Sequence, residues 1–168
     1  MSLSMYSSSV PVFVHYLKSL STILRKCVDY AADKKIDEKV LTGARLFPDM
    51  FPLTRQVQIA CDVAKGCGAR LAGLEVPKYE DNEVTFAELQ ARIDKTIGFL
   101  SSIPESSING SEQKQIKLQA GQRELEFVGD HFLRNWALPN VYFHITTAYN
   151  ILRHNGVAIG KMDFLGGQ

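Results

Sequence analysis

The chain has 168 residues, 45% of them hydrophobic, and a formal net charge of +1. This length and apolar content suit a single domain with one core, so we expect residues 1–168 to form one domain. The balance of 19 basic and 18 acidic residues disfavours binding to nucleic acid or to an anionic membrane surface.

The absence of a targeting signal and the spacing of the cysteines favour a cytoplasmic location. The first ten residues lack the pattern of a secretory signal, and no stretch of 18 uninterrupted apolar residues predicts a membrane span. The three cysteines have no C-x-x-C spacing and form an odd set, which argues against a disulfide framework or a cysteine zinc site. They are interpreted as small core residues: Cys27, Cys61 and Cys67.

Two long helices are predicted in the first half. Apolar residues recur at helical spacing over 8–32, which predicts the first helix. Pro52 suits the first turn of a second helix, because its missing N–H has no partner inside the helix there, and the apolar stripe then continues to Leu71. Gly66 and Gly68 lower helix propensity, and close packing against another helix is one reason to tolerate them.

A third helix and a hairpin follow a polar connector. Thr85 and Glu88 have the spacing of a capping box at the start of the third helix, which ends before Pro104. Between Ser106 and Val128 apolar and polar residues alternate on both sides of a central turn, which predicts a small β-hairpin.

The last helix is expected to begin at Pro139, after a separate short helix over 129–138. Asn155-Gly156 is a plausible stop signal for it. The tail is expected to fold back through Phe164 and Leu165. Four long amphipathic segments cannot each bury an apolar face alone, so the sequence predicts a mainly α, four-helix bundle with a hairpin before its last helix.

The last helix carries the best candidate for a site. Asn140, His144, Ala148 and Ile151 share one helical face, so a single histidine lies among small and apolar groups. A core histidine that is simply hydrogen-bonded to a neighbouring helix is one interpretation. The other is a binding site, to which Gln56 of the second helix could contribute.

The other polar residues are predicted to be structural. Three histidines fit this interpretation: His15, His131 and His154. Three residues on the polar side of the second helix are predicted to form a solvated face: Gln58, Asp62 and Lys65. The sequence has no nucleophile-elbow or phosphate-loop motif.

Two segments, FPDMFPLTRQVQIACDVAKG and PNVYFHITTAYNILRHNGVAIGKMDFLG, carry a resemblance that covers nearly the whole chain. The chain resembles the DinB/YfiT-like superfamily of metalloenzymes, in a branch known only as a domain of unknown function. The resemblance implies an up-down-down-up four-helix bundle that is often a homodimer.

The resemblance also implies a metal site. In the superfamily, one histidine of the second helix and an H-x-x-x-H pair on the last helix bind a divalent metal, and some members use it for thiol transfer. His144 matches the second histidine of the pair, whereas Asn140 stands in place of the first. The second helix has no histidine, and Gln56 or Gln58 is the nearest polar substitute.

Three functional hypotheses follow. In the first, Gln56, Asn140 and His144 bind a small polar ligand in a degenerate site. In the second, His144 helps to bind zinc or nickel in a metal-dependent transferase or hydrolase. In the third, the bundle is a dimeric interaction module without catalysis. The sequence alone does not decide whether the protein is an enzyme.

Overall fold

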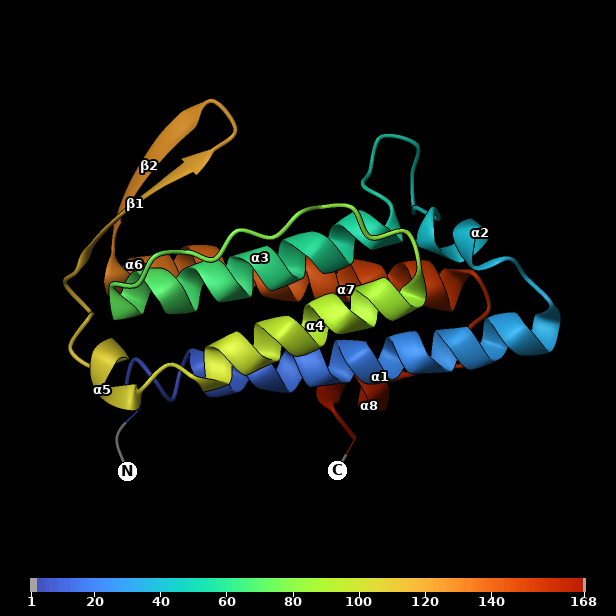
Figure 1. Ribbon diagram of the computed structural model, residues 1–168, viewed down its shortest axis with the longest axis horizontal. Helices are drawn as coiled ribbons and strands as arrows, with labels where there is room; N and C mark the ends of the chain where they lie inside the picture. Colours follow the sequence, from blue (N-terminus) through green and yellow to red (C-terminus); the bar gives the residue numbers. More distant parts are fainter. Residues whose placement is uncertain (1–2, 168) are drawn as a thin grey trace.

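Four long helices form the body of the molecule in the computed structural model, which describes residues 3–167. Their bounds are α1 Val10–Lys34, α3 Leu53–Ala72, α4 Phe86–Ser101 and α7 Leu138–His154. Both α1 and α3 contact α4 and α7, and they also contact each other across the middle of the bundle. The helices α1 and α7 run in one direction and α3 and α4 in the other (Figure 1), which is the up-down-down-up order implied by the resemblance.

The predicted hairpin is confirmed. Strands β1 (Gln115–Ala120) and β2 (Arg123–Val128) pair antiparallel, with Ile116 opposite Phe127. Gly121 has a φ of +61°, a value that glycine adopts without strain in the tight turn. The hairpin projects from the end of the bundle where α3 ends (Figure 1).

Three helices of four or five residues were not predicted, because one helical turn is too short to show periodicity. They are α2 Glu38–Thr42, α5 Glu105–Ile108 and α8 Lys161–Leu165. The capping box before α4 is confirmed, since the N–H of Glu88 donates to Thr85 Oγ1 at 3.2 Å and the N–H of Thr85 donates to Glu88 Oε2 at 2.9 Å.

The connector between α3 and α4 runs back along the bundle. Because these two helices are parallel, residues 74–84 must return from the end of α3 to the opposite end of the molecule. Figure 1 shows this segment, which we call the strap, lying along α3 and α4 without forming a helix or a strand.

The predicted break before the last long helix was wrong. The short helix α6 (Gly129–Phe132) continues through a π-helical turn, Leu133–Ala137, directly into α7. The N–H of Leu138 bonds to the carbonyl of Leu133, five residues earlier. Pro139 has no N–H to continue the α-helical pattern at this point, and a wider turn accommodates it without ending the helix.

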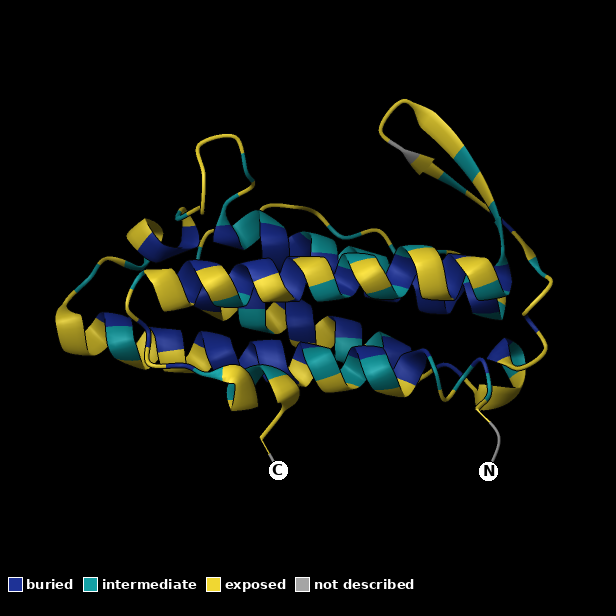
Figure 2. Cartoon of the chain, turned by 180° about the vertical axis from the view of Figure 1, so that it is seen from behind, coloured by how far each residue is buried: buried dark blue, intermediate teal, exposed yellow. Residues whose placement is uncertain are grey.

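The core lies between the four long helices. Figure 2 shows buried and exposed stripes alternating around them, as amphipathic helices require. A Cβ atom on Gly68 would lie 2.8 Å from Leu100 Cδ2 and 3.0 Å from Ile103 Cδ1, so the absence of a side chain there lets α3 and α4 approach closely.

The predicted return of the tail is confirmed at one of its two residues. The Phe164 ring lies 5.3 Å from the ring of Tyr16 and 6.4 Å from that of Tyr149, measured between centroids. The side chain of Leu165 is 40% exposed, so it contributes less to the core. Within residues 3–167, no helix is both long and apolar enough to cross a membrane.

Candidate functional site

His144 and Gln56 form a buried polar pair between α7 and α3. His144 Nδ1 lies 2.7 Å from Gln56 Oε1. An amide oxygen only accepts hydrogen bonds, so Nδ1 must carry the proton and donate. The other end of the amide donates from Gln56 Nε2 to the carbonyl of Phe51 at 3.0 Å. Gln56 therefore holds the imidazole in one orientation and one tautomer.

The imidazole is neutral at physiological pH. Burial lowers the pKa of His144 from its usual 6.5 to about 4, and the positive charge of Arg55 lowers it further in the same direction. Because Nδ1 carries the single proton, Nε2 presents a lone pair. Nε2 makes no hydrogen bond within the described chain, and it is not completely enclosed by the protein. Nε2 therefore keeps a free lone pair, on a residue that is only 9% exposed.

Asn140 lies one helical turn before His144 on α7 and is half-buried. Its Nδ2 donates to the carbonyl of Trp136 at 2.7 Å, at the point where the π turn leads into α7. This bond fixes the amide with Oδ1 as its free end. The structure thus brings Gln56, and not Gln58, into contact with His144, and places Asn140 one turn away with a different partner.

Asn140 lines a groove that sequence reasoning missed. The groove has a volume of about 380 Å³ and lies between α3, the π turn and the hairpin. Its walls combine apolar groups with three charged side chains. The lining includes Arg55, Ile59, Asp62, Arg70, Trp136 and Asn140. His144 and Gln56 do not line the groove themselves, but each has a lining neighbour, Asn140 one turn before His144 in α7 and Arg55 directly before Gln56 in α3.

The predicted solvated face on α3 was wrong. Gln58 and Lys65 are each 4% exposed, because the strap covers this side of the helix. The Gln58 amide donates to Glu83 of the strap at 2.9 Å, and Lys65 Nζ lies 2.9 Å from Asp62. Polar residues at helical spacing resemble a solvated face whether water or a connector covers them.

Arg92 of α4 is the buried centre of this cluster, whereas Asp62 and Asp81 lie at its exposed edge. Its guanidinium, with the side chain 2% exposed, lies 2.9 Å from Asp62 and from Asp81 and 2.8 Å from Glu83. Asp81 also pairs with Arg55. The cluster therefore connects the strap to both helices beneath it. The sequence signal for this cluster was the group of three acidic residues in the strap, at positions 80, 81 and 83.

The remaining histidines have structural contacts or lie at the surface. His15 Nε2 lies 3.0 Å from the carbonyl of Leu165, the His131 ring stacks on Phe127 with centroids 5.9 Å apart, and His154 is exposed at the end of α7. The cysteines are free and buried as predicted. Burial raises the pKa of Cys27 and of Cys61 to about 12, which leaves both as unreactive thiols at neutral pH.

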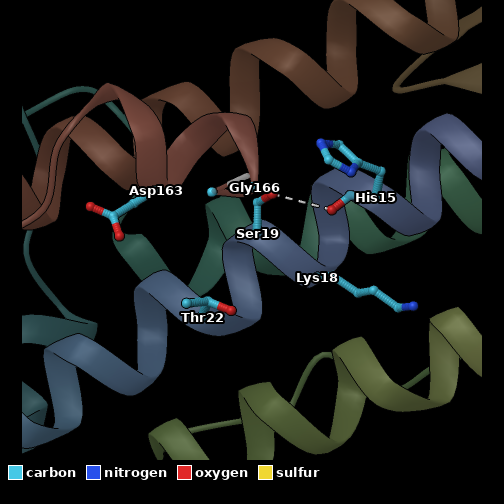
Figure 3. Close-up of a pocket in the computed structure, with 7 residues that line it drawn as sticks. His15, Lys18, Ser19, Thr22, Asp163 and Gly166 are labelled. Carbon is cyan, nitrogen blue, oxygen red and sulfur yellow. Dashed lines mark hydrogen bonds between the residues drawn. The ribbon is translucent and has the colours of Figure 1, made fainter.

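A second hollow, of about 360 Å³, lies between α1 and the C-terminal tail (Figure 3). His15, Ser19 and Asp163 line it, but all three already have partners. The Ser19 hydroxyl donates to the His15 carbonyl at 3.2 Å, and Asp163 accepts from the Gly160 N–H at 2.7 Å and pairs with Lys26. These contacts fasten the tail to α1, so we assign the hollow a structural role.

Comparison with known proteins identifies the family. Residues 5–165 match the family described as "Domain of unknown function (DUF1993)". The chain belongs to the DUF1993 family. It is also similar to a DinB family member protein from Shewanella denitrificans, whose crystal structure it matches with a TM-score of 0.87 and 43% identity over 97% of this chain and 92% of that one. The DinB-like resemblance is confirmed. Among curated proteins, none matches significantly.

The residues of this DUF1993 member do not fit the superfamily's metal site. Between residues 3 and 167, no three His, Cys, Asp or Glu side chains are grouped so that they could hold an ion. His144 has only Nε2 to offer, because Nδ1 is bonded to Gln56. The neighbouring donors are amides of Asn140 and Gln56, and amide oxygens are poor ligands for zinc or nickel. The chemistry of these donors suits hydrogen bonding instead.

Proposed function

We propose that this protein binds a small polar molecule in the groove between α3 and α7, with His144 Nε2 and Asn140 Oδ1 accepting hydrogen bonds from it. The observation that carries the proposal is the 2.7 Å bond from His144 to Gln56. It fixes a neutral imidazole with a free lone pair on Nε2, one helical turn from the free oxygen of Asn140.

Two acceptors one turn apart favour a ligand with hydrogen-bond donors, such as a hydroxyl, amine or amide N–H. Both acceptors are held in place within the protein, Nε2 through Gln56 and Oδ1 through the Trp136 carbonyl. Groups that are already ordered lose little conformational entropy when a ligand binds, which favours affinity. Gln56 has both amide ends occupied, so we assign it a positioning role.

The groove offers sufficient space and a suitable surface. Its volume of about 380 Å³ lies in the range that accommodates small molecules. Ile59 and Trp136 supply apolar surface, and Arg55, Arg70 and Asn140 supply polar groups. This combination of an apolar wall with a few oriented polar groups is typical of ligand sites.

A thermal-shift screen of small hydroxy and amino compounds tests the proposal. We expect compounds that raise the melting temperature of the wild type to have the same effect on His154→Ala, which removes an exposed histidine of the same helix. They should have little or no effect on His144→Ala and on Asn140→Leu, each compared with its own ligand-free form. Asn140 is half-buried, so its replacement keeps the fold intact.

Two outcomes contradict the proposal. One is that no compound class shifts the wild type. The other is that a shift persists unchanged in both His144→Ala and Asn140→Leu, because binding would then occur elsewhere on the bundle.

A further inference from the structure

We infer that the ligand of this groove is an organic anion, whose acidic group binds the guanidinium of Arg70 while its apolar body packs against Trp136. The inference rests on the proposed function, because it concerns the same groove. The proposed function requires only hydrogen-bond donors on the ligand, and the inference adds a negative charge and an apolar body.

Arg70 is the groove charge without a counter-ion. Of the three charged groove residues, Arg55 pairs with Asp81 and Asp62 pairs with both Arg92 and Lys65. Arg70 makes no salt bridge within residues 3–167, although it is half-buried. A positive charge that is partly removed from water and has no protein partner favours binding of an anion from solution.

Gly66 leaves room for the Arg70 guanidinium against α3. A Cβ atom on Gly66 would lie 2.5 Å from Arg70 Nη1, so the guanidinium lies in the space that any other residue would fill. The side chain is thus folded back along α3 toward Gly66, one helical turn earlier, and is half-buried. Burial of the guanidinium lowers the pKa of Arg70, but an arginine stays charged at all physiological pH values.

Trp136 supplies the apolar side of the proposed ligand contact. It lines the same groove, and its ring packs against Phe127 of β2 with centroids 5.6 Å apart, so the hairpin holds it in place. Ile59 lines the groove as well, so an aromatic or aliphatic body bound there has two apolar side chains to contact. Charge at one point and apolar surface beside it select an amphiphilic organic anion over a bare inorganic ion.

Two dyes of matched shape test the inference. 1-Anilinonaphthalene-8-sulfonate and N-phenyl-1-naphthylamine share the same rings and N–H group, and only the first carries a sulfonate. Trp136 is the single tryptophan of the chain, so quenching of its emission reports binding near the groove. Titrations are made on the wild type, on Arg70→Met and on Arg153→Met, which removes an exposed arginine of α7 as a control for net charge.

We expect the wild type and Arg153→Met to bind the sulfonate dye about tenfold more tightly than the neutral dye, since a hydrogen bond to a charged group contributes at least that much. In Arg70→Met the two affinities should become equal. Asn140→Leu should weaken both dyes, which locates them in the groove.

Equal affinities in the wild type, or a preference that survives in Arg70→Met, would overturn the anion inference while leaving the groove as a binding site. Failure of both dyes to bind in an Asn140-dependent way would count against the proposed function itself. The two failures are therefore separable.

Discussion

Protonation of His144 is expected to destabilise the folded protein. In the unfolded chain this histidine takes up a proton near pH 6.5, but in the folded protein only near pH 4. Between these values the unfolded state binds more protons than the folded state, so the free energy of unfolding falls as the pH is lowered. Above about pH 7 the histidine is neutral in both states, and its contribution is constant.

The size of this effect follows from the two pKa values. Each tenfold difference in proton affinity corresponds to about 1.4 kcal/mol, so lowering the pKa from 6.5 to about 4 gives about 3 kcal/mol, lost between neutral pH and pH 4. This is a large share of the 5–15 kcal/mol, roughly, that stabilises a typical domain. The imidazole is only 9% exposed, so solvent does little to reduce it.

The measurement compares urea unfolding of the wild type and of His144→Gln at several pH values from 8 to 4. The glutamine amide can still donate to Gln56 Oε1 but does not titrate, so the variant keeps the contact and loses the pH dependence. Other carboxylates titrate in both proteins, and the difference between the two curves isolates His144. Wild type should lose about 3 kcal/mol more than the variant on acidification.

Parallel curves for the two proteins between pH 6.5 and 4 would refute this reasoning. An NMR titration gives an independent check, since the His144 ring protons should shift only near pH 4. A midpoint near 6.5 would mean that the imidazole is hydrated, and the argument for a neutral acceptor in the groove would fail with it.

Three further predictions concern the cluster, the glycines and metal binding. Arg92→Met should lower the free energy of unfolding by about 3 kcal/mol in urea titrations, because it leaves the largely buried Glu83 without its counter-charge, whereas Asp62 and Asp81 keep Lys65 and Arg55; a loss below 1 kcal/mol would show that the cluster is well hydrated. Gly66→Ala should stabilise the folded protein by up to about 1 kcal/mol through helix propensity, since only the movable end of Arg70 stands in the way. Gly68→Ala should destabilise the folded protein by about 1–3 kcal/mol, because it overpacks the α3–α4 contact. Melting temperatures of the two variants that move in the same direction would contradict this pair of predictions. Tag-free protein titrated calorimetrically with zinc or nickel should show no binding that His144→Gln removes, and a stoichiometric, His144-dependent site would overturn our interpretation of the donors.

The bundle could be predicted from sequence because its signals are local. Apolar spacing defined the four long helices, and the Thr85–Glu88 pair located the start of α4 to the residue. The π turn could not be predicted in this way, because proline after an apolar run is an equally good signal for a helix start. Only the packing of α6 and α7 as one continuous rod decides between the two.

The candidate site was predicted in part for a similar reason. Gln56 and His144 lie on or next to apolar stripes that must meet in the core, so their contact follows from the helical pattern. Arg70 and Trp136 lie far apart in the sequence and line one groove only because the hairpin returns to the bundle there. The burial of Lys65 likewise depends on the path of the strap, which no periodicity in α3 records.

The π turn makes the groove sensitive to chain length as well as to residue identity. Such a turn holds one residue more than an α-helix would, so deleting a single residue from Leu133–Ala137 would restore the regular helix and rotate everything before it by about 100°. His144 would keep its bond to Gln56, while Phe132 and the hairpin turned to a new direction. Relatives that differ here by one deletion would therefore share the bundle and the histidine but present a differently shaped binding surface.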